Sequence, residues 1–345
     1  MQLPVLVIKL GSAVISDSQG NIDEKIIRKL AAEVASLSKA YHIVLVSSGA
    51  VGSGKSFFKK YKGSLVERKA AAAVGNPILI RLYDRYCSKH GITVAQALCE
   101  RHHFSNRAQF LQLKETFHEF WRNDILPVVN ENDLVSNVEL KFSDNDELAT
   151  LLALGFDADT LVICTSVGGF LDGEKKVIPV VSTIDQSVMG YISNEKSGLG
   201  LGGMLSKMTF TRLATSMGIR VSITGLAGKE PLTRSLNGLQ GTTFKPQRSN
   251  LKARQKWLAS GSITLGELQL DEGAEKALHA RKSLLSVGVK QLQGAFSAGE
   301  VVQLRNTQET IIGVAKVKLG AADLQQQLQT RNVLAAHADD IVLFD

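Results

Sequence analysis

The chain has 345 residues, of which 44% are hydrophobic and 21% charged, a composition that excludes a disordered or low-complexity protein. Its length predicts two domains, and no apolar run reaches the roughly 18 to 20 residues of a membrane span. The formal net charge of +7 arises almost entirely before residue 251, because residues 251–345 contain 11 basic and 10 acidic side chains. The N-terminus shows no cleavable signal, so a cytoplasmic location is expected.

Apolar periodicity predicts strands and helices in alternation as far as residue 224. Asn21 is expected to cap the first helix, with Glu24 three residues later. Alternation of this kind predicts an α/β fold with a mostly parallel central sheet and helices on both faces. The expected strands cover residues 4–10, 43–48, 92–98, 125–130, 160–165 and 219–224, and the expected helices cover 22–37, 66–90, 107–122, 144–155 and 204–217.

The pattern of alternating strands and helices ends before residue 245, where a polar stretch looks like a linker. Beyond it, short strand-like runs are separated by glycine-containing turns, with one helix near 271–280. The sequence therefore predicts a first domain over 1–246, a linker over 247–252 and a small β-rich domain over 253–345.

Residues 49–56, GAVGSGKS, match the G-x-x-x-x-G-K-[ST] pattern of phosphate-binding loops. Two observations weigh against that interpretation. The residues after Ser56 form a poor first helix, because charged side chains and Gly63 interrupt any apolar stripe. No apolar strand that ends in an aspartate supplies the expected magnesium ligand. A second pattern, Gly198-x-Gly200-x-x-Gly203, matches the dinucleotide fingerprint but does not follow a strand, so it indicates only an anion-accepting turn before a helix.

Four polar clusters follow expected strands or open an expected helix, at the edge where open α/β sheets bind their ligands. They are Lys9-Leu-Gly11-Ser12, Ser47-Ser48-Gly49-Ala50, Asn130-Glu131-Asn132-Asp133 and Ser143-Asp144-Asn145-Asp146. The last cluster also has the composition of a helix N-cap. Helix capping alone does not account for all four clusters.

These clusters, together with GLGLGGMLSK at 198–207, resemble the amino-acid kinase superfamily and, within it, the glutamate 5-kinases. The segments DEGAEKAL, LLSVGVK, GAFSAGEVV and IIGVAK resemble the C-terminal PUA domain of bacterial members. The resemblance implies ATP- and Mg²⁺-dependent phosphorylation of the glutamate γ-carboxylate, the first step of proline biosynthesis. It also implies feedback inhibition by proline and a homo-oligomer, dimeric or tetrameric.

The resemblance also implies a role for individual residues. Lys9 and Lys207 would contact the phosphates and the phosphoryl group in transfer, and Asp146 would orient both lysines. Gly11 would let the backbone approach the same oxygens. The nucleotide would be lined by Thr165, Ser166, Leu201, Gly202, Gly203, Met204, Leu205, Ser206 and Lys207, and glutamate would be held by Ser48, Gly49, Ala50, Asp133 and Asn145. No metal ligand is assigned.

Two departures from the family pattern concern the nucleotide side. Ser166 stands where the family usually has an acidic residue, and the segment after it is short, so Asp172 is an uncertain metal or nucleotide ligand. A carboxylate acceptor is already ionised at neutral pH and needs positioning and charge neutralisation more than a general base. The adjacent histidines His102 and His103 are accordingly expected to point in different directions and to be surface residues or ordinary partners of other groups. The three cysteines are expected to be small buried residues.

Two alternatives stay open. The acceptor could be aspartate, acetylglutamate, carbamate or UMP, as in other superfamily members. The chain could instead be an RNA-binding PUA protein, but the nearly neutral C-terminal part, with few aromatic side chains beyond Trp257 and Phe296, predicts weak affinity for RNA.

Overall fold

The computed structural model describes residues 3–17, 21–105, 107–134, 144–193, 202–247, 264–328, 330 and 332–343. The chain divides into two compact units, residues 1–100 with 112–249 and residues 101–111 with 250–345. The linker expected at 247–252 falls almost wholly outside the described residues, so the expected domain boundaries remain a prediction.

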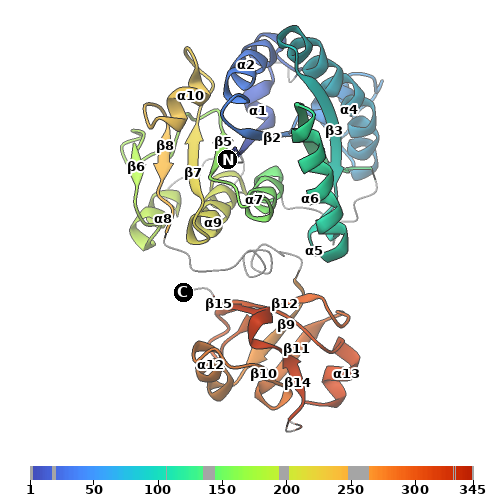
Figure 1. The fold of residues 1–345 in the computed structure, drawn as a ribbon, viewed down its shortest axis with the longest axis vertical. Coiled ribbons are helices and arrows are strands. Elements are labelled where there is room, and N and C mark those ends of the chain that lie inside the picture. Colours follow the sequence, from blue (N-terminus) through green and yellow to red (C-terminus); the bar gives the residue numbers. More distant parts are fainter. Residues whose placement is uncertain are drawn as a thin grey trace. The chain divides into compact units, whose positions relative to one another are not determined.

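The first unit contains an eight-stranded sheet with the order β3-β4-β2-β1-β5-β7-β8-β6 (Figure 1). All its strand pairs are parallel except β7–β8, which confirms the predicted mostly parallel sheet. The strands are β1 (Val5–Leu10), β2 (His42–Ser47), β3 (Thr93–Cys99), β4 (Ile125–Glu131), β5 (Thr160–Cys164), β6 (Val180–Val181), β7 (Arg220–Thr224) and β8 (Thr242–Phe244).

The helices up to residue 247 begin with α1, which directly follows β1. They are α1 (Ser12–Ile15), α2 (Glu24–Leu37), α3 (Ala50–Lys55), α4 (Leu65–Cys87), the 3-10 turn η1 (Ser88–His90), α5 (His102–Ser105), α6 (Arg107–Arg122), α7 (Asn145–Gly155), α8 (Gln186–Ser193), α9 (Gly202–Ser216) and α10 (Pro231–Leu236). The cap of α2 is Asp23 rather than Asn21. The Asp23 carboxylate accepts a bond from the Lys25 backbone N–H at 2.8 Å, whereas the Asn21 N–H is bound to Asp17.

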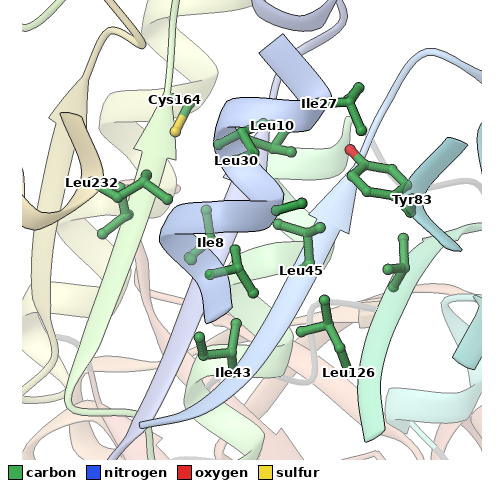
Figure 2. Packing of buried hydrophobic residues seen from close by; sticks show 14 of the residues in the cluster. Ile8, Leu10, Ile27, Leu30, Ile43, Leu45, Tyr83, Leu126, Cys164 and Leu232 are labelled. Carbon is green, nitrogen blue, oxygen red and sulfur yellow. The ribbon is translucent and has the colours of Figure 1, made fainter. Parts of the chain in front are cut away.

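Both faces of the sheet are buried at β1, which lies near the middle of the strand order, since all six β1 residues are buried. Figure 2 shows Ile8 and Leu10 of β1 beside Leu45 of β2, beneath Ile27 and Leu30 of α2. Successive strand residues point to opposite faces, so Lys9 points away from this apolar cluster. The alternation in VLVIKL therefore sends one ammonium group to the face covered by α7.

The crossing of α3 and α4 explains the glycines of the motif at 49–56. A Cβ on Gly54 would lie 1.9 Å from the Ala71 carbonyl oxygen, and one on Gly75 would lie 1.8 Å from that of Ala50. Both positions exclude any side chain, because the helix backbones touch there. Residues 50–55 form a helix that packs on α4, not a loop open to a phosphate. This agrees with the sequence, which argued against a phosphate-binding loop.

The C-terminal unit has a five-stranded sheet with the order β11-β9-β12-β13-β15 and a short β10–β14 pair. Its apolar core includes Leu268, Leu304 and Ala335. Its elements are β9 (Thr264–Leu270), α12 (Glu272–His279), β10 (Leu284–Leu285), η2 (Ser286–Gly288), β11 (Val289–Gly294), β12 (Val301–Arg305), β13 (Ile311–Lys316), α13 (Ala321–Gln326), β14 (Leu334–Ala336), η3 (Ala338–Asp340) and β15 (Ile341–Leu343). This is the small β-rich domain that the sequence predicted. Within the described ranges of the whole chain, no helix has the length and hydropathy needed to cross a bilayer.

The helix crossing predicts that Gly54→Ala destabilises the first unit. The added methyl group must push two helix backbones apart, which costs about 3 kcal/mol and lowers the melting temperature by roughly 5 to 10 °C. Thermal unfolding followed by circular dichroism measures the change. The neighbouring Lys55→Ala variant is the control and should melt within about 2 °C of the wild type. Equal melting of both variants would contradict the assigned role of Gly54.

Candidate functional site

Neighbouring parallel strands bring the expected site segments to one edge of the sheet. Strands β4, β2, β1 and β5 lie side by side and run in the same direction. Gly11, Ser48 and Thr165 each follow directly or almost directly on the end of a strand. The Ser48 backbone N–H also donates to the Leu10 carbonyl at 3.1 Å, so the turns after β1 and β2 are bonded to each other.

A buried carboxylate joins two lysines at this edge. Asp146 Oδ1 lies 2.6 Å from Lys9 Nζ, and Asp146 Oδ2 lies 3.0 Å from Lys207 Nζ. The Asp146 side chain is about 1% exposed, that of Lys9 6% and that of Lys207 16%. The structure thus gathers three residues that are 61 to 198 positions apart in the sequence.

The first turn of α7 is held in place by its own cap. Asp144 Oδ1 accepts bonds from the backbone N–H groups of Asp146 at 2.8 Å and Glu147 at 3.2 Å. Asp144 Oδ2 accepts a bond from the Ser206 hydroxyl of α9 at 2.6 Å. One carboxylate therefore fixes the turn that carries Asp146 and links it to the residue beside Lys207.

The cluster combines two ammonium groups with a neighbouring glycine, features that a phosphate-binding site uses. The ammonium groups of Lys9 and Lys207 meet at the Asp146 carboxylate in a largely buried place. At Gly11, a Cβ would lie 3.8 Å from Lys9 Nζ and 3.4 Å from the Cys164 carbonyl oxygen. Glycine thus keeps side-chain atoms out of the space beside the lysine. Such a site favours a multiply charged anion that replaces the water around the ammonium groups.

A second group of polar side chains lies beside the cluster. Asn145, the first residue of α7, donates from Nδ2 to Ser48 Oγ at 2.9 Å and to Asn130 Oδ1 at 3.0 Å. Gly49 has a φ of 103° and begins the turn into α3, where Ala50 is buried. Asp133 is half-buried, two residues beyond β4. The structure therefore brings Ser48 and Asn145 together directly.

The residues expected to line the nucleotide are described in part. Thr165 is buried, and its N–H donates to the Thr224 carbonyl at 2.8 Å, whereas Ser166 is exposed. Leu201 lies outside the described residues, and so do Gly198, Gly200 and Ser143. The first two turns of α9 contain Gly202, Gly203, Met204, Leu205, Ser206 and Lys207. Of these, Met204, Ser206 and Lys207 are half-buried.

Asp172 has a local structural role. Its Oδ1 accepts bonds from the backbone N–H groups of Glu174 and Lys176, each at 2.9 Å, and so stabilises a tight turn. This Asx-type turn accounts for the aspartate without a ligand. The expectation that the side chains of His102 and His103 point in different directions is wrong. They are half-buried in α5, and their ring centroids are only 4.2 Å apart.

Sequence reasoning missed several buried polar side chains beneath the site. Asn76 of α4 accepts a bond from Asn130, and the Tyr83 hydroxyl lies 2.7 Å from Ser47 Oγ. The signal in the sequence was weak, because a single asparagine inside a helix is usually a surface residue. The three cysteines are free and buried, as predicted, and burial raises the pKa of the Cys164 thiol to about 12.

Comparison with known proteins identifies both units. The family model described as "Amino acid kinase family" matches residues 4–225, and the "PUA domain" model matches residues 266–333. A glutamate 5-kinase of Aquifex aeolicus is 37% identical and aligns with 98% of this chain and 99% of its own length. A glutamate 5-kinase of Kosmotoga olearia is 36% identical and aligns with 93% of this chain and 90% of its own length.

Solved structures agree at the level of the fold. Carbamate kinase from Giardia lamblia bound to AMP-PNP aligns over 71% of this chain and 99% of its own length. The TM-score is 0.52 and the sequence identity 19%. At this identity the likeness concerns the fold alone, and it confirms the architecture predicted for the first unit.

The buried cluster predicts that Asp146→Asn lowers the stability of the first unit. The variant leaves two neighbouring ammonium groups without their shared counter-charge, and loss of one partner from a buried ion pair costs about 3 to 5 kcal/mol. Urea denaturation measures this loss. The control is Glu174→Gln, because the Lys176–Glu174 pair is 2.7 Å long but both side chains are 75% exposed, and its loss should cost less than about 1 kcal/mol. Similar losses in both variants would argue against a structural requirement for Asp146.

Proposed function

The chain belongs to the amino acid kinase family and is a phosphotransferase, and we propose that it transfers the γ-phosphoryl group of ATP to the side-chain carboxylate of L-glutamate. The products are γ-glutamyl phosphate and ADP. The proposal of glutamate as acceptor draws on the glutamate 5-kinases that align with nearly the whole chain. The alternative acceptors are aspartate, acetylglutamate, carbamate and UMP.

The Lys9–Asp146–Lys207 cluster carries this proposal. Phosphoryl transfer concentrates negative charge on the oxygens of the transferred group, and catalysis consists mainly of positioning and neutralising that charge. Two lysines held on opposite oxygens of one carboxylate present two ammonium groups in a fixed arrangement. The Asp144–Ser206 hydrogen bond joins the start of α7, which carries Asp146, to α9, which carries Lys207. The cluster therefore needs little reorganisation as charge develops.

The described residues fit a nucleoside triphosphate. Lys9, Gly11 and Lys207 would hold its phosphates, because Gly11 places no side-chain atom beside the Lys9 ammonium group. Thr165, Ser166 and the first turn of α9, including Gly202, Gly203, Met204 and Leu205, would line the rest of the nucleotide. ATP supplies the phosphoryl group and brings Mg²⁺ on its phosphates, and we assign no protein ligand to the metal.

The acceptor needs no general base. A glutamate side chain is ionised at neutral pH, since its unperturbed pKa is about 4.3. Ser48, Gly49, Ala50, Asp133 and Asn145 would hold it beside the lysines. Ser48 and Asn145 are already hydrogen-bonded to each other, so this part of the site is preorganised. Orientation of the acceptor carboxylate towards the phosphates is then the main task of these residues.

We further propose that the reaction is the first step of proline biosynthesis in the cytoplasm, with proline as feedback inhibitor of a homo-oligomer. The PUA unit is proposed to have a structural or regulatory role rather than to bind RNA. Part of its positive charge is neutralised internally. Arg305 Nε lies 2.6 Å from Glu267 Oε2, and Lys318 Nζ lies 3.1 Å from the buried Asp340. Such pairing reduces the charge that phosphate contacts require.

An assay of ADP release with a panel of acceptors tests the function. We expect turnover with L-glutamate and at least a hundredfold lower kcat/KM with aspartate, acetylglutamate, carbamate and UMP. Hydroxylamine should trap the product as γ-glutamyl hydroxamate, which confirms an acyl phosphate. Turnover with one of the other acceptors and none with glutamate would contradict the proposal and assign the chain the specificity of another member of the family.

Lysine variants test the assigned chemistry. Lys9→Ala and Lys207→Ala each remove a positive charge used in the transition state, and each should lower kcat by about 10²-fold or more. Lys55→Ala is the matched control, because Lys55 completes the phosphate-loop pattern but lies in the α3 helix. Its kcat should stay within about twofold of the wild type. A larger loss for Lys55→Ala than for Lys9→Ala would reverse the assignment.

A further inference from the structure

A row of hydrogen-bonded side chains runs from α4 through the interior to the acceptor side of the site. Asn130 of β4 donates from Nδ2 to Asn76 Oδ1 of α4 at 3.1 Å, and Asn145 donates to Asn130 Oδ1 at 3.0 Å. Asn76 is 8% exposed and Asn130 6%. Asn145 makes the last link, to Ser48 Oγ at 2.9 Å. Asn76 is the far end of this row and is remote in sequence from the other members.

A backbone group fixes the direction of every amide in the row. The Glu131 N–H donates to Asn130 Oδ1 at 3.0 Å, and a backbone N–H can only donate. The Asn130 oxygen therefore lies towards Glu131 and Asn145, and its NH₂ group must lie towards Asn76. Asn145 in turn must offer its NH₂ group to that oxygen. Both donors of Asn145 are then used, by Asn130 and Ser48, and its Oδ1 has no partner among the described residues.

The position of Asn76 is set by the helix crossing beside it. Gly75 allows α4 to touch α3, since a Cβ there would lie 1.8 Å from the Ala50 carbonyl oxygen. Asn76 also lines a cavity of about 10 Å³, close to the size of one water molecule, together with Ser47, Gln96 and Asn130. Asn130 and Asn76 thus line the same small cavity, and the Asn76 oxygen is the acceptor for the Asn130 NH₂ group. Without that acceptor, Asn130 would keep a buried donor unsatisfied or turn its amide over.

We propose that Asn76 is a positioning residue for the acceptor: through Asn130 it holds the Asn145 amide with the oxygen free to accept a hydrogen bond from the acceptor molecule. The inference rests on the proposed function, in which Asn145 contacts the acceptor. Asn76 itself touches no substrate. A carbonyl oxygen presented in this way suits a donor such as the ammonium group of an amino acid. Loss of the Asn76 side chain should therefore weaken acceptor binding. Nucleotide binding, which involves Lys9 and Lys207, should stay the same.

Steady-state kinetics of Asn76 variants test this role. Asn76→Leu has a similar size but no acceptor, and it should raise the KM for the acceptor that the wild type uses by about tenfold, with the KM for ATP within twofold. Asn76→Asp keeps an acceptor oxygen for Asn130 and should restore the KM to within about threefold. Ser235→Ala is the control, because it also removes a buried side-chain hydrogen bond, the 2.6 Å contact with Ser222, and should change neither KM. An unchanged acceptor KM in a folded Asn76→Leu variant would overturn the proposal.

A second measurement is independent of the acceptor's identity. In ¹⁵N-labelled protein, the side-chain NH₂ protons of Asn145 should exchange slowly with solvent, and Asn76→Leu should accelerate this exchange while backbone amides in β1 stay protected. Equal protection in both proteins would refute the coupling even if glutamate proved not to be the acceptor. Failure of glutamate in the acceptor panel with accelerated exchange in the variant would refute only the proposed function. If Asn76→Leu does not fold, Asn76→Ala should change both measurements in the same direction, less strongly because one water molecule fits the space.

Discussion

The contact between Asp146 and its two lysines sets the requirements that the rest of the first unit meets. A carboxylate with about 1% of its side chain exposed is costly to bury, and only close cations and a fixed geometry offset the loss of hydration. Lys9 comes from the central strand and Lys207 from α9, so the cluster forms only when β1, α7 and α9 are packed together. The ion pairs are thus weak evidence for stability but strong evidence for a site, because a purely structural core would be better served by apolar residues.

The sheet supplies the rigidity that this arrangement needs. Every residue of β1 is buried between parallel neighbours, and its last residues lead straight into Gly11. The α7 cap then performs two tasks with one side chain, since Asp144 holds the backbone of Asp146 and the hydroxyl of Ser206. Phosphate-binding and acceptor-binding groups are consequently fixed to the same few elements. A shift of α7 would move Asn145 and Asp146 together, which couples the two halves of the site mechanically.

The fold could be predicted from the sequence, because alternating apolar periods indicate a parallel sheet. Polar clusters at strand ends indicated a ligand site at the edge of that sheet, whereas the roles of Lys9, Lys207 and Asp146 were implied only by the family resemblance. The cap of α2 was misplaced by two residues, since Asn21 and Asp23 are equally good capping residues and only the course of the chain decides between them. Asn76 gave no usable signal, because its role depends on a partner 54 residues away and on a helix crossing that periodicity does not encode.

The glycines of GAVGSGKS show why a local pattern and its usual chemistry can separate. In a phosphate-binding loop, glycines let consecutive backbone N–H groups wrap around an anion. Here Gly49 adopts a positive φ that starts α3, and Gly54 removes a side chain from the contact with Ala71, so the same residues serve a turn and a helix crossing. In the phosphate-binding loop and in the helix crossing alike, glycine contributes by having no side chain. The neighbouring residues determine whether an anion or another backbone approaches it. At Gly11 a Cβ would make ordinary contacts, one of them with the Lys9 ammonium group, whereas at Gly54 the backbone of another helix fills the same space.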